Sequence, residues 1–317
     1  MEVYDHPNPE EGPQQEEPQQ EKREIKKNRE GEYVPKMKPS YARNLKFEPS
    51  YINANFSFWN KFIFFLIGFV GLELLAFICQ LIFLQIPAFT VGNGFSAFGA
   101  SLLNLLVYII IFAVMLVLLL TNKKKPFFYI LQEFKLGSTF GYMFMALGII
   151  TAFNYLFSII YRGIPIYGSN ANQEGIETLT FSFPIMMVIT TVFLAPFTEE
   201  LTYRIGLLDT IGHKSRWLGI VISAIIFGLV HFDYSPIIYI IRAIQNSGDI
   251  TLPLNLLYIE LLNLPIYISM GGVLGFFYAK TGRITVSWGA HTLNNLIAFI
   301  SALLYPFVEQ LLERIGF

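Results

Sequence analysis

The run FPIMMVITTVFLAPFTEELTYR, residues 183–204, joins a long apolar segment to a group of charged residues at its end. Its first fifteen residues carry no charge, so a helix continued through them carries Glu199 and Glu200 into or beside a lipid bilayer. A charged side chain there costs about 2.5–3.5 kcal/mol to insert and therefore indicates a functional site. Arg204 shares the helical face of Glu200, whereas Glu199 lies about 100° around the helix. We predict that Glu200 pairs with Arg204 and that Glu199 stays unpaired.

The composition indicates an all-α membrane protein. Of the 317 residues, 54% are hydrophobic and only 14% are charged, whereas soluble domains carry about 25% charged residues. The apolar residues form blocks longer than 18 residues, which predicts a polytopic bundle of seven to eight transmembrane helices in contact with lipid. The net charge of −1 gives no sign of a nucleic-acid partner. The single cysteine, Cys79, excludes an internal disulfide and a cysteine-cluster metal site.

The charge pattern divides the chain into three parts. Residues 1–55 hold 9 Lys and Arg, 11 Asp and Glu and the segment PQQEEPQQEK. Such a stretch cannot bury enough apolar surface to fold alone, so we expect a disordered cytoplasmic tail. Residues 56–170 are predicted to form the N-terminal membrane helices, and residues 171–317 the membrane core that contains the site.

Seven apolar segments are long enough to cross a bilayer. They cover residues 59–86, 97–121, 140–161, 180–211, 216–233, 255–280 and 284–310. The short run 236–244 is open to three readings: an eighth span, a re-entrant segment or an interfacial one. With a cytoplasmic N-terminus, 19 of the 22 Lys and Arg residues, Arg204 included, fall in segments counted as inside. Since cytoplasmic loops are enriched in Lys and Arg, this asymmetry predicts that orientation.

Two histidines in apolar surroundings are predicted to meet the acidic pair. Glu199 and His231 lie about 14 and 17 residues from the turn near residue 213, or about 21 and 26 Å along antiparallel helices. His291 lies about 10 Å inside the helix that is expected to start near residue 284. Asn295 follows His291 by four residues and shares its face. We therefore expect Glu199, His231 and His291 at one depth, nearer the cytoplasmic face, with Asn295 on the same helical face as His291.

These residue types suit the hydrolysis of an amide bond. An unpaired carboxylate among apolar helices, Glu199, can act as a general base on water. An imidazole, from His231 or His291, can orient that base, donate to an oxyanion or bind a metal, and the Asn295 amide is a neutral oxyanion donor. Glu199, His231 and His291 also resemble a zinc site with one open position, so the cofactor stays open, with zinc as the candidate metal. The helical H-E-x-x-H spacing of many zinc proteases is absent.

Three short motifs, in this order, resemble those of the CAAX protease and bacteriocin-processing (CPBP, or Abi) family of intramembrane endopeptidases. They are EExxxR (Glu199, Glu200, Arg204), FxxxH (Phe227, His231) and HxxxN (His291, Asn295). The resemblance covers about residues 180–300 and implies an eight-helix core that cleaves peptide bonds near the membrane surface.

The same resemblance assigns a role to each motif residue. It implies that Glu199 activates the water with help from His231, that His291 and Asn295 bind the oxyanion or a metal, and that Glu200 and Arg204 support the site. The motifs do not decide between a metalloprotease and a glutamate-dependent protease.

Two other functions remain open at this stage. The polar residues would also join helices in a non-catalytic scaffold or immunity protein, and buried acids and imidazoles also relay protons in transporters. No internal repeat of the kind common in transporters is visible. Glu260 and Asn263 are expected at an interface or between helices rather than in catalysis. For an enzyme, we expect a membrane-associated peptide or protein substrate and the plasma membrane of a bacterium.

Overall fold

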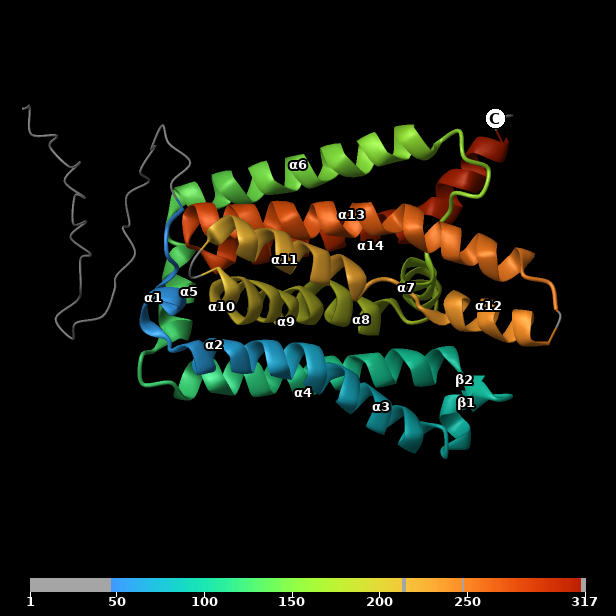
Figure 1. Cartoon of the computed structure of the whole chain (residues 1–317), viewed down its shortest axis with the longest axis horizontal. Helices are drawn as coiled ribbons and strands as arrows, with labels where there is room; N and C mark the ends of the chain where they lie inside the picture. Colours follow the sequence, from blue (N-terminus) through green and yellow to red (C-terminus); the bar gives the residue numbers. More distant parts are fainter. Residues whose placement is uncertain (1–46, 213–214, 247, 315–317) are drawn as a thin grey trace, which may run out of the picture.

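The computed structural model describes residues 47–212, 215–246 and 248–314, and within them the chain forms a bundle of long helices (Figure 1). Within these described ranges, six helices are long and apolar enough to cross a membrane. They are Phe58–Phe83, Ala97–Thr121, Gly137–Tyr161, Pro184–Ile211, Thr251–Thr281 and Ile284–Val308. The prediction of an all-α integral membrane protein is therefore confirmed.

Several of the long helices are composite. The first joins α2 (Phe58–Phe65), the π-helix η1 (Leu66–Gly71) and α3 (Leu72–Phe83), and the other long ones are α4 (Ala97–Thr121), α6 (Gly137–Tyr161), α13 (Thr251–Thr281) and α14 (Ile284–Arg314). The fourth joins α8 (Pro184–Met187), π-helix η3 (Val188–Leu194), α9 (Ala195–Glu200), π-helix η4 (Leu201–Leu208) and α10 (Asp209–Ile211). The shorter elements are α1 (Tyr51–Asn55), η2 (Pro87–Phe89), the antiparallel strands β1 (Thr90–Val91) and β2 (Gly94–Phe95), α5 (Pro126–Glu133), α7 (Ala171–Ser182), α11 (Arg216–Leu229) and α12 (Ser235–Gln245).

The two ends of the bundle differ in charge. One end, which we call the α1 end, carries α1, α5 and α10, and the opposite α7 end carries α7, α12 and the β1–β2 hairpin (Figure 1). Lys123, Lys135 and Arg283 lie in connections at the α1 end. Counting Arg204 with those loops is wrong, because its side chain is fully buried inside the bundle. A cytoplasmic α1 end stays a prediction.

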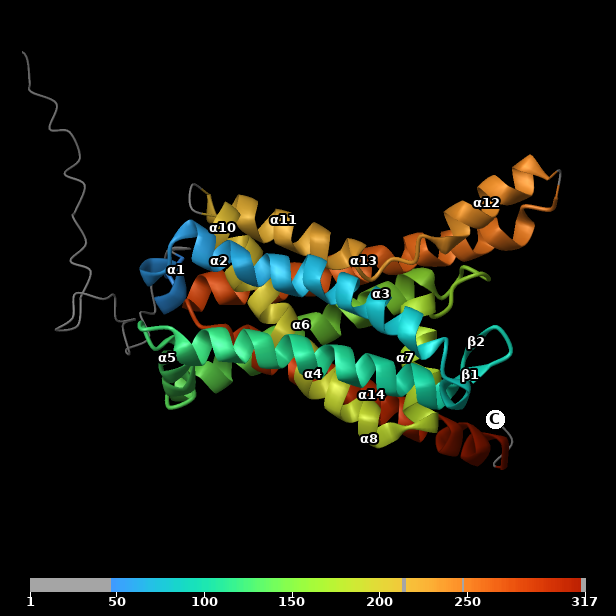
Figure 2. The ribbon, with the colours of Figure 1, turned by 90° about the horizontal axis from the view of Figure 1, so that it is seen from below.

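The apolar segment 216–233, which is predicted to cross the membrane, is a broken helix instead. α11 ends at Leu229 after 14 residues, the chain is non-helical around His231, and α12 starts at Ser235. Pro236 in the first turn of α12 favours the break, because it has no N–H to continue the helical hydrogen bonds from α11. Both α11 and α12 pack against α13, and α12 leaves the bundle together with the first part of α13 (Figure 2).

The predicted start of the fourth span is also corrected. Thr180 belongs to α7, and the chain bends at Phe183, with φ −140° and ψ 64°, before Pro184 starts α8. Proline is well suited to a first helical turn and disfavours helix before it. Residues 184–211 then form one span whose end at Ile211 matches the prediction.

The last part of the predicted disordered tail, residues 47–55, belongs to the folded bundle instead. Residues 1–46 lie outside the described part of the chain, but residues 47–55 are ordered and include α1. The Ser50 side chain accepts the N–H of Asn53 as an N-cap, and Tyr51 and Ile52 are buried in the core at 2% and 3% exposure. Burial of these two apolar side chains offsets the entropy cost of ordering the segment.

The helix from Pro184 to Ile211 is the centre of the bundle. Every residue from Ala195 to Thr210 is buried except Glu199. Gly206 permits this packing, because a Cβ atom there would lie 2.5 Å from the backbone nitrogen of Phe65 in α2. The only interruption in this buried run is therefore one of the two acids singled out by the sequence.

Candidate active site

Glu200 and Arg204 form a fully buried ion pair, as predicted. Arg204 donates from Nε to Oε2 of Glu200 at 2.9 Å and from Nη2 to Oε1 at 3.3 Å. Its third nitrogen, Nη1, donates to the Ser223 hydroxyl on α11, which in turn donates to the Tyr203 carbonyl. Because an unpaired charge in this position would be strongly destabilising, the pair fixes the orientation of the Glu200 carboxylate.

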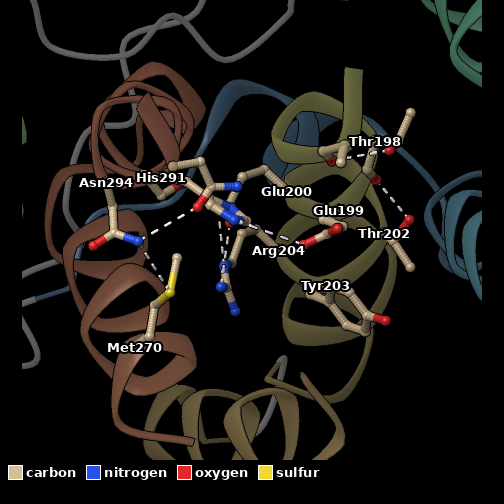
Figure 3. A network of polar contacts seen from close by, with 12 residues as sticks. Thr198, Glu199, Glu200, Thr202, Tyr203, Arg204, Met270, His291 and Asn294 are labelled. Carbon is tan, nitrogen blue, oxygen red and sulfur yellow. Dashed lines mark hydrogen bonds and ion pairs between the residues drawn. The ribbon is translucent and has the colours of Figure 1, made fainter. Parts of the chain in front are cut away.

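His291 lies between the two acids (Figure 3). Its Nδ1 is 3.1 Å from Oε1 of Glu200, and its Nε2 is 3.7 Å from Oε2 of Glu199. A carboxylate only accepts hydrogen bonds, so the short contact requires the Nδ1 proton to point at Glu200. The second nitrogen is thereby presented to Glu199.

Glu199 differs from its neighbour in having a free oxygen. Its side chain is 16% exposed, and Oε2 is buried without a hydrogen-bond partner. A buried acceptor without a partner costs about 1–3 kcal/mol, and such groups often bind a water or a ligand. Glu200 is thus held by Arg204, whereas Glu199 keeps one oxygen, Oε2, without a hydrogen bond and 3.7 Å from Nε2 of His291.

His231 lies in the non-helical segment after α11. Its Nδ1 is 2.7 Å from the Phe227 carbonyl, so Nδ1 carries a proton and a neutral ring has its lone pair on Nε2. The ring stacks on Tyr267 of α13, with centroids 4.5 Å apart and planes at 13°. The Phe227 ring contacts both imidazoles, with its centroid 4.7 Å from that of His231 and 5.8 Å from that of His291.

Asn295 binds a backbone carbonyl that the helix itself leaves without a donor. In η3, the N–H of Ala195 bonds to the carbonyl of Thr190, five residues back. The next such bond would join residue 196 to Thr191, but Pro196 has no N–H. Asn295 Nδ2 donates to the Thr191 carbonyl at 2.9 Å instead. One amide hydrogen is thus used structurally, and the other remains for a ligand.

The predicted residues meet at one cavity of about 220 Å³. Glu199, His231, His291 and Asn295 all line it, and so does Phe227. Glu200 and Arg204 do not line it, but lie behind His291. The cavity also extends toward the α7 end, where the polar side chains of α4 and α7 complete its wall. These are Asn104, Tyr108, Asn172, Gln173 and Thr180.

The cavity wall contains residues that the motifs miss. Tyr108 of α4 interacts with Glu199, and Tyr267 of α13 stacks on His231. Glu260 is buried at 3% exposure and hydrogen-bonds to the loop before α7, so it joins segments, in line with the expectation. Asn263 likewise donates to the Gly168 carbonyl. The sequence signal that could have identified these positions is a polar side chain within an apolar segment.

Zinc bound by Glu199, His231 and His291 stays a prediction. Within the described residues, no group of three or more His, Cys, Asp or Glu side chains is positioned to hold a metal ion. His291 has its Nδ1 on Glu200 and presents Nε2 toward Glu199, 3.7 Å from Oε2.

Comparison with known proteins supports the resemblance for the core of the chain. Residues 181–297 match the family described as type II CAAX prenyl endopeptidase Rce1-like. An uncharacterized protein of Mycoplasma capricolum is 27% identical over 158 residues, which are 46% of this chain and 39% of that protein. The proposed membrane peptidase YdiL of Bacillus subtilis is 26% identical over 147 residues, 46% of this chain and 49% of YdiL.

These matches identify a core rather than a whole protein. The aligned region spans less than half the length of each of these two relatives. No solved structure matches the chain. The matched segment contains all three motifs and every residue from Glu199 to Asn295 that was assigned to the site. Residues 181–297 are thus similar to the Rce1-like family, in agreement with the resemblance that the three motifs indicate.

Proposed function

We propose that this protein is a glutamate-dependent endopeptidase that hydrolyses a peptide bond of a membrane-embedded peptide or protein. The observation that carries the proposal is the buried Oε2 of Glu199, which has no hydrogen-bond partner among the described residues, in a side chain that lines a cavity together with two imidazoles. A scaffold or immunity protein needs polar groups that bind one another, and a carboxylate oxygen left free inside a membrane protein gives it no benefit.

The attacking water is held by two acceptors. It donates one hydrogen to Glu199 and the other to Nε2 of His231, whose Nδ1 proton is held by the Phe227 carbonyl. Glu199 takes a proton as the water oxygen attacks the scissile carbonyl carbon, and it then returns that proton to the leaving amine nitrogen. Such general acid–base transfer contributes about 10²–10⁴-fold to a rate.

The developing oxyanion needs hydrogen-bond donors near the same carbon. The free amide hydrogen of Asn295 is one, since the other is held by Thr191. A doubly protonated His291 supplies a second, from Nε2, while its Nδ1 proton stays on Glu200. Donors that are already oriented stabilise the transition state without reorganisation, and each contributes about 2.7–4 kcal/mol. The Glu200–Arg204 pair serves this step by fixing His291.

The lining of the cavity favours polypeptide main chain as the substrate group. Toward the α7 end the wall presents amides and hydroxyls, including Asn104 and the buried, unpartnered hydroxyl of Thr180. An extended peptide has unpaired N–H and C=O groups that must be satisfied inside a membrane, and amide side chains pair with both. We propose that the peptide itself, rather than an attached prenyl chain, occupies this cavity, in the plasma membrane of a bacterium.

The test is cleavage of quenched-fluorescence peptides by the purified full chain in liposomes. Glu199→Gln should lose at least about 10²-fold of the rate, whereas Glu174→Gln, the same change at an exposed position on α7, should cleave normally. Addition of a chelator should leave the rate unchanged. Loss of activity with chelator would replace the glutamate-dependent mechanism by a metal-dependent one. Normal cleavage by Glu199→Gln would remove Glu199 from the mechanism.

A further inference from the structure

A buried group of polar residues outside the three motifs surrounds the backbone of His231. Asn170 precedes α7, Glu260 and Tyr267 lie on α13, and all three make hydrogen bonds or ring contacts with the non-helical segment 230–234 or with one another. We infer that Asn170 and Glu260 are positioning residues, which hold the His231 imidazole in place at the helix break. This inference rests on the proposed protease function.

The break itself creates the need for such residues. Helix α11 ends at Leu229, and the N–H groups of Val230, His231 and Phe232 still bond to its carbonyls. Among the described residues, the His231 carbonyl and the Asp233 N–H have no backbone partner. An unsatisfied backbone group in a membrane costs several kcal/mol. Asn170 Nδ2 donates to the His231 carbonyl at 3.0 Å, and Glu260 Oε2 accepts the N–H of Asp233 at 3.1 Å.

Asn170 connects the break to two other elements. Its side chain is 1% exposed, and its Oδ1 accepts the Gln173 N–H at 3.1 Å as the N-cap of α7. The same oxygen accepts the Tyr267 hydroxyl at 3.2 Å. Because the Tyr267 ring stacks on His231, Asn170 constrains both the carbonyl of His231 and the surface on which its ring rests.

Glu260 joins the same segments from the other side. Its Oε1 accepts the N–H of Ala171 at 2.9 Å, and its Oε2 accepts from Asn170 at 3.2 Å and from Asp233. All of these partners are donors, so each oxygen of this buried carboxylate is used. α7 supplies part of the cavity wall, and these bonds therefore fix the wall relative to His231.

The consequence for the reaction follows from the role of geometry in catalysis. His231 reaches the cavity from an irregular segment, and a regular helix does not define where its ring lies. A displacement of about 1 Å in a catalytic group can cost about 10²-fold in rate. Asn170 and Glu260 replace the missing helical bonds with side-chain bonds, so that the ring keeps one position.

The experiment separates positioning from simple folding. Asn170→Ser keeps a good N-cap for α7, since serine caps about as well as asparagine, but its short side chain does not reach the His231 carbonyl. We expect kcat to fall at least tenfold with KM within about twofold. Glu260→Gln should lower kcat similarly. The glutamine NH₂ group would face a backbone N–H or the Asn170 amide, and both of these are also donors. Glu174→Gln on α7 is the matched control and should match the wild type.

A second measurement does not depend on activity. Nitrogen NMR of histidine-labelled protein in detergent should show a changed Nδ1/Nε2 signature for His231 in Asn170→Ser and not in Glu174→Gln. Wild-type kcat together with an unchanged His231 signal in Asn170→Ser would overturn the inference while the proposed function stands. If the wild type cleaves no peptide, the proposed function fails, and the His231 signal still decides whether Asn170 positions the ring.

Discussion

Glu199 and Asp209 are acids on the same long helix, ten residues apart, yet their surroundings differ. Asp209 is fully buried near the α1 end, and both carboxylate oxygens are used: Oδ1 accepts from Arg216 at 2.7 Å, and Oδ2 accepts from the hydroxyls of Ser50 and Tyr278. Glu199, in the middle of the bundle, has one carboxylate oxygen, Oε2, with no hydrogen-bond partner.

The difference separates an acid that holds the fold together from one that is available to a ligand. Both acids lie within the apolar segment 180–211 that the sequence predicts, and burying either carboxylate costs free energy. At Asp209 the protein recovers that cost with its own donors, which join the segment before α1 to α10 and α13. At Glu199 one oxygen is left without a hydrogen bond, and the residue lines the cavity.

The largest expected effect comes from neutralising each acid in turn. Glu199→Gln should lower kcat at least about 10²-fold and leave the melting temperature equal or higher, because a desolvated charge is removed. Asp209→Asn should do the opposite: it should cost about 3 kcal/mol of stability by leaving Arg216 without its partner, with kcat of the folded protein retained. Thermal unfolding in detergent measures the stability of each variant, and peptide cleavage measures its kcat. A large stability loss in Glu199→Gln would contradict the comparison.

A second acid at the α1 end gives a pH dependence of stability. Glu133 is 8% exposed and accepts from the N–H and hydroxyl of Thr285, near Arg283, and burial raises its pKa from 4.5 to about 7. A raised pKa in the folded state stabilises the protein below pH 4.5, and this contribution is lost as the pH rises to about 7. The free energy of unfolding falls by up to about 3 kcal/mol, since each unit of difference in pKa corresponds to about 1.4 kcal/mol.

The variant Glu133→Gln should remove this dependence, so that the free energy of unfolding no longer falls between pH 4.5 and 7. Glu174→Gln at an exposed position serves as its control and should keep the wild-type profile. Chemical unfolding followed by tryptophan fluorescence at several pH values measures both. A wild-type profile that is flat over this range would show that Glu133 is not the titrating group.

The helix between the two acids should be sensitive to small changes in volume. At Gly206 a Cβ atom would lie 2.5 Å from the Phe65 backbone, whereas at Gly148 of α6 nothing lies within 4 Å. Gly206→Ala should therefore cost about 1–3 kcal/mol through overpacking, and Gly148→Ala should be neutral or gain up to about 1 kcal/mol from helix propensity. Melting temperatures of the two variants test this, and equal values would contradict close packing at Gly206.

The smallest effect is expected at the far wall of the cavity. Thr180→Val replaces an unpartnered buried hydroxyl with a methyl group and should leave stability unchanged or slightly raised. If that hydroxyl binds substrate main chain, KM should rise about threefold to tenfold, since one hydrogen bond contributes about 0.5–1.5 kcal/mol. Steady-state kinetics measure the change. An unchanged KM would place the peptide away from α7.

Sequence reasoning predicted much of the site because the site depends on side-chain chemistry at helical spacing. Glu200 and Arg204 pair because four residues separate them on a helix, and Glu199 points elsewhere for the same reason. The convergence of His231 and His291 with Glu199 followed from depth along helices that cross a membrane of fixed thickness. The helix break at His231 and the order of residues 47–55 did not follow, since both depend on contacts with distant segments.

The sequence by itself determined the class of fold, most of the spans and the residues of the site, because apolar run length and helical periodicity are local properties of a chain in a membrane. Only the tertiary structure decided how buried polar groups are satisfied. Asn295 supplies the donor that Pro196 lacks, and Asn170 and Glu260 replace the bonds lost at the break after α11. Hydrogen-bond partners are chosen by proximity in space, and these residues, 27 to 104 positions apart, become neighbours only when the helices pack.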